Sequence, residues 1–454
     1  MKLDVWLEAF AAPVGTLSRH DDKSLTFTYA PGSQPTQRIS MSLPLRDEPY
    51  RDADARAFFG NLLFEGRELD RVMAVHGLDR DDIGGLLEHL GADCPGALSV
   101  TPEGTGPGKR PGVFPDDYEE IEPARLLSIL RSLHFYGRLP DDTRDPSPIA
   151  GVQPKLALVA RDGRYYVPRA GSRAPSTHIL KVSPRTQSET TRHEAALLTL
   201  ARTVGLDVAE PVPLTFEDDE TGAEINAILS TRFDRSFEGA KITRTHCEDF
   251  CQALGLPKEL KYERNAVQED RKFSLRAIST IAERSAAPGL FRMTFLQQML
   301  FNLMVGNTDN HGKNGTILYK GTSGTLAPLY DVVPVILDRT VTHRLSFTLG
   351  GAEWSEDVTM ERLMDAMRDL GFARPRLDRP TRLMLERLAS EGPGQLGQVG
   401  PLGDKALADA VAAQMTVVEE GLGLGLPIAP RDYYPRLVRD EKPEGGTGGW
   451  GGLS

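Results

Sequence analysis

The sequence predicts an α+β fold with a strand-rich front lobe, a mostly helical back lobe and a β-rich subdomain before both. Three observations support this. Short runs of alternating apolar and polar residues occupy positions 1–45 and about 145–235, helical spacing dominates after residue 245, and a segment rich in Gly, Pro and charge at 102–117 separates the first unit from the rest. At about 150 residues per domain, 454 residues also favour two or three folded units.

Residues 1–101 are predicted to form an N-terminal β-rich domain that ends near Thr101. Its expected strands are LDVWL, VGTLS, SLTFTYA and ISMSLPL, separated by the turn signals HDDK and PGSQP. Two helical stretches follow, ARAFFGNLLFEGRELDRVMAVHGL and DDIGGLLEHLGA, and the second has an Asp at its start and a Gly near its end.

Residues 102–144 are expected to form a linker with one short helix. The stretch PEGTGPGKRPGVFPDD is dense in Gly, Pro and charge, which is typical of an exposed linker. The apolar spacing of PARLLSILRSL then predicts a helix.

Residues 145–240 are predicted to be the strand-rich lobe. The strands GVQPKLALVA, RYYVPRA and THILKVS are separated by turns, and a helix over about 189–204 has Thr191 and Glu194 at the spacing of a capping box. Two further strands, AEPVPLTFE and EINAILSTRFD, flank the polar turn DDETG.

Residues 241–425 are predicted to be a helical lobe, and 441–454 a disordered Gly-rich tail. The expected helices are FCQALG, FSLRAISTIAERS, TFLQQMLFNLMVG, TMERLMDAMRDLG, PTRLMLERLAS and DKALADAVAAQMTVVEEGL. Cys247 and Cys251 are interpreted as small apolar residues on one helix face, because three cysteines fit neither a disulfide framework nor a paired zinc motif.

Composition excludes several classes of protein. The net charge of −11 argues against a surface that grips nucleic acid throughout, although a local basic patch stays possible. The first residues carry Asp4 and Glu8, unlike a signal peptide, and no apolar run approaches the roughly 20 residues needed to span a bilayer. We therefore expect a cytoplasmic protein with no membrane partner.

The segment VGNTDNHGKN, at 305–314, is the most informative for chemistry. Asp309 and Asn314 stand five residues apart, the offset of the Asp and Asn in the kinase catalytic loop. Such a loop places a carboxylate beside a nucleophilic hydroxyl and an amide oxygen on a magnesium ion, with His311 and Lys313 near phosphates. The alternative is a polar loop that only caps a helix.

Asp331 in LAPLYDVVP, 17 residues after Asn314, is predicted to be a second metal-binding residue. It follows an apolar segment interpreted as a strand, where the metal-binding Asp of a kinase lies. Asn314 and Asp331 would supply the oxygen ligands that Mg²⁺ prefers. The alternative is a turn residue at a strand end.

The front lobe supplies candidates for nucleotide binding. Lys181 stands inside the apolar strand THILKV, where its charge needs an anionic partner, and Glu194 could orient it. A loop with Gly151 and Lys155 could present backbone N–H groups to phosphate, and STRFDR is placed as a hinge. The alternatives are an edge-strand lysine and a glutamate that only caps its helix. The order of these pieces predicts a two-lobed, kinase-like phosphotransferase that uses ATP and Mg²⁺.

These residues resemble the HipA family of serine/threonine kinases, the toxins of bacterial HipA–HipB toxin-antitoxin modules. The matching pieces in the two lobes are GVQPKLAL, STHILKVS, TRFDR, EDFCQALG, GNTDNHGKN and LAPLYDV, and at the front FTYAPG, ISMSLPL, FFGNLLFEG and GALSVTPEG. The resemblance covers roughly residues 1–420.

The resemblance implies that Asp309 is the catalytic base and that Asn314 and Asp331 bind magnesium. It also implies a set of ATP-binding residues: Ala150, Gly151, Val152, Gln153, Pro154, Lys155, Lys181, Thr231, Arg232, Phe233, His311, Gly312, Lys313, Asn314, Tyr330 and Asp331.

It further implies a DNA-binding, helix-turn-helix HipB-like antitoxin as partner and an aminoacyl-tRNA synthetase, typically glutamyl-tRNA synthetase, as substrate. Family members phosphorylate a serine just before the phosphate loop, but the usual positions here hold Pro148 and Ala150. Ser147 is the nearest hydroxyl, and its flanking prolines restrict it. We therefore expect weak or no autophosphorylation of Ser147, and control by the antitoxin.

Two alternative functions stay open: a small-molecule phosphotransferase, and a catalytically silent module that only holds an antitoxin. A basic cluster at 374–382 includes Arg379 and Arg382, which could contact DNA indirectly within an antitoxin complex. The alternative for this cluster is a solvated helix end.

Overall fold

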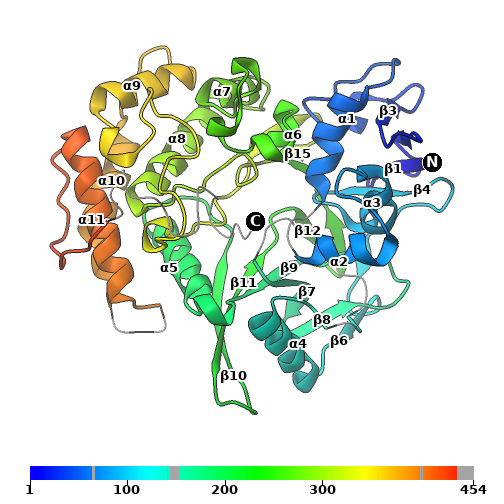
Figure 1. The fold of residues 1–454 in the computed structure, drawn as a ribbon, viewed down its shortest axis with the longest axis horizontal. Coiled ribbons are helices and arrows are strands. Elements are labelled where there is room, and N and C mark those ends of the chain that lie inside the picture. The colour runs from blue at the N-terminus through cyan, green and yellow to red at the C-terminus, as the bar shows by residue number, and fades with distance from the viewer. Residues whose placement is uncertain (64–66, 141, 144–152, 399, 401, 437–454) are drawn as a thin grey trace. The chain divides into compact units, whose positions relative to one another are not determined.

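The computed structural model describes residues 1–63, 67–140, 142–143, 153–398, 400 and 402–436, and the chain divides into two compact units (Figure 1). Unit 1 consists of Met1–Ser188, Thr215–Glu259 and Thr316–Thr325. Unit 2 consists of Glu189–Leu214, Leu260–Gly315 and the chain from Leu326 onward. Each unit therefore combines three separate stretches of sequence, and the mixture of helices and sheets confirms the predicted α+β class.

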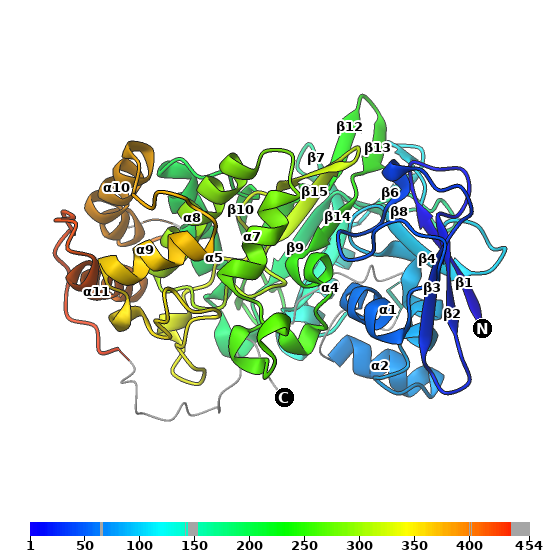
Figure 2. The same ribbon diagram turned by 90° about the horizontal axis from the view of Figure 1, so that it is seen from above.

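Unit 1 begins with a four-stranded antiparallel sheet in the order β3-β2-β1-β4. Its strands are β1 (Lys2–Leu7), β2 (Gly15–Arg19), β3 (Leu25–Tyr29) and β4 (Leu98–Pro102), and its helices are α1 (Asp52–Phe59), α2 (Arg67–His76) and α3 (Ile83–Leu90). Figure 2 shows α1 and α2 on one face of this sheet. Asp82 caps α3 by accepting the Gly85 N–H at 3.0 Å, as the sequence predicted.

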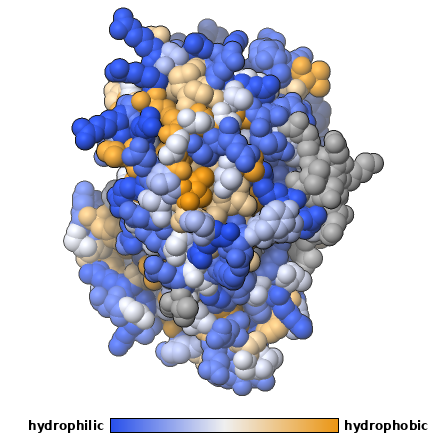
Figure 3. All heavy atoms as spheres, turned by 90° about the vertical axis from the view of Figure 1, so that its left-hand side faces the viewer, coloured by the Kyte–Doolittle hydropathy of each residue, from blue (hydrophilic) through white to orange (hydrophobic). Residues whose placement is uncertain are grey.

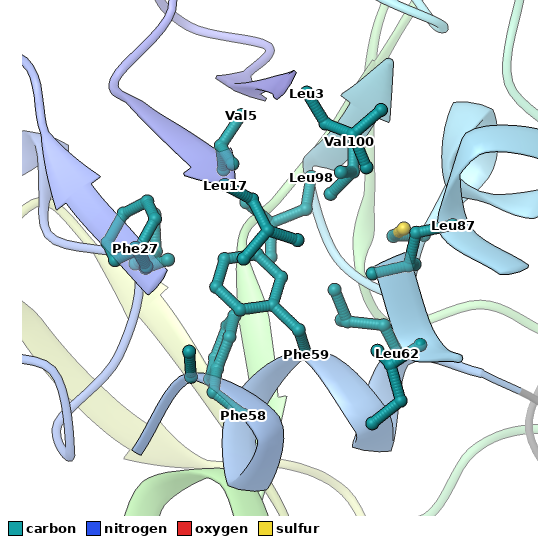
Figure 4. Packing of buried hydrophobic residues seen from close by; sticks show 14 of the residues in the cluster. Leu3, Val5, Leu17, Phe27, Phe58, Phe59, Leu62, Leu87, Leu98 and Val100 are labelled. Atoms are coloured by element: carbon teal, nitrogen blue, oxygen red, sulfur yellow. The ribbon is translucent and has the colours of Figure 1, made fainter. Parts of the chain in front are cut away.

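The core of this part lies between the sheet and the helices. Leu3, Val5 and Leu17 from the strands pack with Phe58 and Phe59 from α1, and all five are fully buried (Figure 4). Alternate residues of a strand share one face of the sheet, and residues three or four apart share one face of a helix, so these apolar side chains all face the core.

The predicted strand ISMSLPL is wrong: residues 39–45 form no strand. Their polar groups bind other parts of unit 1 instead. The fully buried carboxylate of Glu248 accepts hydrogen bonds from the Ser40 hydroxyl, the Met41 N–H at 2.9 Å and the Tyr319 hydroxyl. Ser42 donates its hydroxyl to the Gln252 carbonyl at 2.6 Å. Burial raises the pKa of Glu248 to about 7 despite these hydrogen bonds.

A second sheet has six strands in the order β10-β11-β9-β7-β8-β6. They are β6 (Tyr118–Glu120), β7 (Lys155–Arg161), β8 (Arg164–Pro168), β9 (His178–Val182), β10 (Pro211–Glu217) and β11 (Glu224–Thr231). Helix α4 (Pro123–Tyr136) packs against β9 and β11, and the His134 ring bonds the Ser183 carbonyl at 2.7 Å. All five strands predicted between residues 145 and 231 are present.

The expectation of an exposed linker at 102–117 holds only in part: Glu103, Arg110 and Val113 are exposed, whereas Lys109 and Gly112 are buried. Lys109 is 3% exposed, and its ammonium lies 3.9 Å from the Asp93 carboxylate. Gly112 and Val113 form β5, which pairs with β13 (Lys241–Arg244), and β13 pairs with β12 (Arg235–Glu238). The buried ion pair and the strand pairing connect this stretch to other segments of unit 1.

The last sheet of unit 1 has the order β14-β15-β16, from β14 (Cys247–Asp249), β15 (Thr316–Lys320) and β16 (Ser323–Leu326). Cys247 lies in β14 and Cys251 in helix α6 (Phe250–Leu254), so the prediction of one shared helix face is wrong. Asp249 begins α6 by accepting the Gln252 N–H at 2.8 Å, and this cap ends the strand between the two cysteines. Both cysteines are buried, and neither forms a disulfide.

Unit 2 is mostly helical and is organised around α8 (Pro288–Val305), whose last eleven residues are nearly all buried (Figure 1). The other helices are α5 (Thr190–Thr203), α7 (Leu275–Glu283), α9 (Met360–Asp369), α10 (Arg379–Leu396) and α11 (Lys405–Leu422). Helices α7 and α11 pack on α8, and α10 packs on α11 and α5. A helix that is apolar on all sides belongs at the centre of such a bundle.

Helix α5 confirms the predicted helix but not its capping box. The helix begins at Thr190 after Glu189, two residues earlier than a cap at Thr191 requires, so Thr191 and Glu194 lie inside it and are buried. No helix among the described residues combines the length and the apolar composition that crossing a bilayer requires. The predicted tail, 441–454, lies outside the described residues.

Candidate active site

The loop at 307–314 leaves α8 through a turn that only glycine permits. Gly306 ends the helix with φ +73°, and a Cβ at this position would lie 2.5 Å from the Ile336 side chain. Asn307 then holds the loop, because its Nδ2 donates to Asn302 Oδ1 at 2.9 Å and its Oδ1 accepts the Asp309 N–H at 3.2 Å. Local hydrogen bonds therefore fix Asp309 directly after the helix.

Asp309 and Asn314 are brought together, as their spacing predicted. Asn314 Nδ2 donates to the Asp309 carbonyl at 2.9 Å, and the Asn314 N–H donates to the His311 carbonyl at 2.8 Å. Because the amide nitrogen is committed to the loop, the amide oxygen of Asn314 is the atom available to a cation.

The Asp309 carboxyl is buried, and burial shifts its pKa. It is 8% exposed, and burial raises its pKa to about 7, although the hydroxyl of Tyr262 and the charge of Lys261 act in the opposite direction. The charge of Asp331 raises the pKa further. A carboxyl with a pKa close to the working pH is suited to proton transfer.

His311 is a buried, neutral ring. Burial lowers its pKa well below the ordinary value, and its Nδ1 accepts the Lys313 N–H at 3.3 Å, which leaves Nε2 as the protonated nitrogen. Tyr330 donates its hydroxyl to the Lys313 carbonyl at 3.0 Å. In unit 2, the structure thus places His311, Gly312, Lys313 and Tyr330 around one loop.

Asp331 adopts a left-handed backbone conformation with φ +56°, which is uncommon for a residue other than glycine. The strand predicted before it is absent, because Leu329 makes only an isolated parallel bridge with Val208. Its charge acts on both Asp309 and His311, so its half-buried carboxylate lies near the loop. Strain of this kind concentrates at functional sites.

Asn314 and Asp331 fit a magnesium ion by their chemistry. They offer an amide oxygen and a carboxylate, the hard oxygen ligands that Mg²⁺ prefers, beside a second carboxyl at Asp309. A bound divalent cation would also neutralise the repulsion between the Asp309 and Asp331 carboxylates.

In unit 1, two predicted ATP-binding lysines stand opposite each other. Lys155 opens β7, and its register partner in β9 is Lys181. Both are half-buried, and like charges directly opposite each other on adjacent strands repel. Pro154 joins the two strands as well, since its carbonyl accepts the Val182 N–H at 2.9 Å. The pairing of Lys155 with Lys181 therefore places two positive charges side by side, an arrangement that a bound anion would stabilise.

The rest of the predicted phosphate loop is only partly described. Gln153 and Pro154 precede β7, whereas Ala150, Gly151 and Val152 lie outside the described residues, as does Ser147. Lys181 belongs to unit 1 and Glu194 to unit 2, so their pairing stays a prediction.

The predicted hinge, residues 231–233, begins at Thr231, the last residue of β11. The Arg232 N–H donates to the Thr177 carbonyl at 2.9 Å, and Phe233 is half-buried. The guanidinium of Arg232 contacts Asp234 at 2.9 Å, and the Arg235 guanidinium contacts the same carboxylate at 2.8 Å. Burial alone would raise the pKa of Asp234, but the two guanidinium groups outweigh it and hold the pKa below its usual range.

A second buried charge cluster lies nearby in unit 1. The Arg244 side chain is fully buried and contacts Glu8 Oε2 at 2.8 Å and Asp93 Oδ1 at 3.5 Å. Its backbone N–H donates to Glu8 Oε1 at 2.7 Å. These contacts join strand β13 to the N-terminal β-rich part.

Sequence reasoning missed Tyr262, whose hydroxyl contacts Asp309, and its charged neighbours Lys261 and Arg264. The only signal is a tyrosine flanked by charges in the run KYER, 47 residues before Asp309, which matches no spacing rule.

Glu189, His193 and Asp404 bring ligand atoms within 4.8 Å of one another in unit 2. His193 Nε2 lies 2.8 Å from Asp404 Oδ2, and Glu189 accepts a hydrogen bond from Arg192 at 2.5 Å. His193 and Asp404 bind each other and Glu189 binds Arg192, so we assign the cluster a structural role between α5 and α11.

Arg379 and Arg382, the predicted DNA contacts, are exposed at the start of α10. Arg382 pairs with Glu386 at 3.1 Å and donates to the Leu424 carbonyl at 3.0 Å. Figure 3 looks from the side on which α10 and α11 lie in Figure 1, and shows hydrophilic side chains mixed with apolar ones. The arginines' role in binding DNA stays a prediction.

Comparisons with known proteins show the family to which the chain belongs. The HipA N-terminal domain family matches residues 3–101, and the HipA-like C-terminal domain family matches residues 147–391. A protein of Sinorhizobium fredii with the name "Putative kinase Y4mE" is 33% identical over 353 residues, which cover 77% of this chain and 80% of that protein. The serine/threonine-protein kinase toxin HipA of Shewanella oneidensis is 27% identical, over 74% of this chain and 76% of that protein.

A solved structure shares the fold. The complex of HipA, HipB and operator DNA from Shewanella oneidensis matches with a TM-score of 0.72 at 24% identity, over 93% of this chain and 97% of that chain. This match confirms the predicted kinase-like fold, and the two domain families confirm the resemblance seen in the sequence. The chain therefore belongs to the HipA family of kinases.

Proposed function

We propose that this chain is an ATP- and Mg²⁺-dependent serine/threonine protein kinase that serves as the toxin of a bacterial toxin-antitoxin module. The observation that carries the proposal is the hydrogen bond that joins Asn314 to Asp309 in one loop, together with the Asp331 charge close enough to raise the pKa of Asp309. Its proposed target is an aminoacyl-tRNA synthetase, with glutamyl-tRNA synthetase the first candidate from the family resemblance, and its proposed place of action is the cytoplasm.

The residues of the two units have different proposed tasks. Asp309 accepts the proton of the substrate hydroxyl as that oxygen attacks phosphorus, and Asn314 and Asp331 would hold Mg²⁺, which would neutralise phosphate charge. Lys155 and Lys181 bind phosphate oxygens, while Thr231, Arg232 and Phe233 present the hinge backbone to adenine. The neutral His311 ring serves as a hydrogen-bonding group.

A HipB-like antitoxin is the proposed partner, and DNA is contacted only through that complex. The support is the fold shared with the HipA–HipB–operator structure, together with the exposed Arg379 and Arg382. We still expect weak or no autophosphorylation of Ser147. Because the chain would then not inactivate itself, we propose that the antitoxin controls its kinase activity.

The direct test incubates the purified chain and Mg-ATP with a set of aminoacyl-tRNA synthetases and maps phosphate by mass spectrometry. Phosphoserine or phosphothreonine on one synthetase supports the proposal. ATP-dependent labelling of aminoglycosides or other small hydroxyl compounds, without protein labelling, favours the small-molecule alternative. Absence of any transfer favours the silent antitoxin-binding module.

Lys181→Ala is expected to raise the KM for ATP by about tenfold to a hundredfold and to slow transfer, because a charge-assisted contact to phosphate is worth about 1.5–3 kcal/mol. Steady-state kinetics would measure both effects. Lys241→Ala, on the exposed part of β13, is the matched control and should behave as wild type. Equal kinetics for all three proteins would make Lys181 an ordinary strand lysine.

Asp331→Ala is expected to weaken nucleotide binding only when magnesium is present, because the substitution removes a charged metal ligand. Calorimetric titration with ATP, with and without Mg²⁺, would measure this difference. Asp365→Ala, at an exposed pair with Arg368, controls for loss of an acidic side chain. The same loss of affinity in both buffers would show that Asp331 does not act through the metal.

A further inference from the structure

The segment 261–264 is fixed against the candidate catalytic loop by backbone hydrogen bonds. The Lys261 carbonyl accepts the Gly312 N–H at 3.0 Å, and the Glu263 N–H donates to the Ser346 carbonyl at 2.9 Å. Ser346 in turn donates its hydroxyl to the Thr308 carbonyl at 2.6 Å. The segment thus belongs structurally to the loop, although 47 residues separate Tyr262 from Asp309.

Tyr262 points its hydroxyl at the Asp309 carboxylate. The residue is 6% exposed, and Tyr262 Oη donates to Asp309 Oδ1 at 2.5 Å. The His311 ring lies edge-on to the tyrosine, with centroids 5.1 Å apart and planes at 81°. The Arg264 guanidinium lies 4.0 Å from the tyrosine ring centroid. Contacts from two residues therefore fix the ring that carries the hydroxyl.

We propose that Tyr262 is a positioning residue for Asp309: its hydroxyl holds Oδ1, so that Oδ2 faces the substrate hydroxyl and accepts its proton. This inference rests on the proposed kinase function. The reacting proton moves from the substrate oxygen to Asp309 as that oxygen bonds to the γ-phosphorus of ATP. The bond from this phosphorus to the oxygen that bridges it to the β-phosphate breaks, ADP leaves with that oxygen, and Tyr262 keeps its own proton throughout. A fixed carboxylate orientation of this kind is what proton transfer in a near-attack geometry requires.

Several charged groups around Asp309 also affect the pKa of its carboxyl, in addition to the Tyr262 hydroxyl. Lys261 and Arg264 favour the ionised carboxylate, Asp331 disfavours it, and the buried His311 is neutral. Lys313 also faces this region, since its charge acts on His311. The Tyr262 hydrogen bond favours the ionised form, so its removal should raise the pKa of Asp309.

The first test is the pH dependence of phosphoryl transfer by Tyr262→Phe. We expect kcat to fall about tenfold or more at pH 7 while the KM for ATP changes little, and the acid limb of the kcat profile to move up by about one pH unit. A purely structural tyrosine would leave that limb in place.

The second test needs no catalysis. Burial raises the pKa of Asp309 to about 7, and asparagine does not titrate. The stability of wild type minus that of Asp309→Asn should therefore fall with rising pH and become constant above about pH 7. In the Tyr262→Phe background this plateau should begin about one unit higher.

Tyr319→Phe is the matched control, because it removes a buried tyrosine hydroxyl from another buried carboxylate, Glu248, in unit 1. It should leave both the acid limb and the plateau unchanged. If Tyr262→Phe changes neither the acid limb of the kcat profile nor the pH at which the plateau begins, the inference is wrong. If wild type transfers no phosphate at all, the proposed function fails, while the stability titration still decides whether Tyr262 controls Asp309.

Discussion

Asp309→Asn is expected to reduce phosphoryl transfer by about 10²–10⁴-fold, because an amide cannot accept the proton of the substrate hydroxyl. The fold should persist, since asparagine has nearly the same shape as aspartate. Above pH 7 the variant should be at least as stable as wild type, because it removes a buried charge whose pKa burial raises to about 7.

The measurement is transfer of labelled phosphate to the target, with ATP affinity and thermal unfolding recorded in parallel. In cells without an antitoxin, wild type should arrest growth and Asp309→Asn should not. Asp365→Asn, at an exposed position of α9, is the matched control and should arrest growth as wild type does. Transfer by Asp309→Asn at near wild-type rate would remove Asp309 from the mechanism.

Arg244→Met is expected to destabilise unit 1 by about 3–5 kcal/mol, the largest stability effect we anticipate. Methionine keeps much of the side-chain volume, but it leaves the buried carboxylates of Glu8 and Asp93 without their guanidinium. Urea unfolding monitored by circular dichroism would measure the loss as a lower midpoint.

The control for that substitution is Arg164→Met, which breaks a pair with Glu120 whose side chains are 65% and 40% exposed. Exposed pairs contribute only about 0–1 kcal/mol, so this variant should unfold almost as wild type does. A loss below about 1 kcal/mol for Arg244→Met would show that the two carboxylates find other partners or become protonated.

The sequence was a good guide where function depends on spacing along one loop. Asp309 and Asn314 are five residues apart, and a loop of that length brings them together whatever surrounds it. The strand around Lys181 was also predictable, because an alternating apolar pattern has one interpretation when turn residues flank it.

The sequence was a poor guide where a residue's partner is distant along the chain. Tyr262 and Asp309 meet through folding, and no periodicity links positions 47 apart. The segment at 39–45 has the alternation of a strand, yet Glu248 and Gln252 bind its polar groups and no strand forms. Cys247 and Cys251 have helical spacing, but the Asp249 cap divides them. Tertiary hydrogen bonds overrode local pattern in each case.

The discontinuity of unit 1 sets an order of events during protein synthesis. Strand β14 cannot pair, and Glu248 cannot accept the Tyr319 hydrogen bond, until β15 has been synthesised, about seventy residues after Glu248. A nascent chain that stops before Thr316 leaves β14 without its partner strand and Glu248 without the Tyr319 hydroxyl, so that only Ser40 and Met41 can donate to this carboxylate. Unit 1 is completed at Thr325, and Asp331 follows six residues later. A chain that lacks the last strand of unit 1 therefore also lacks its second proposed metal ligand.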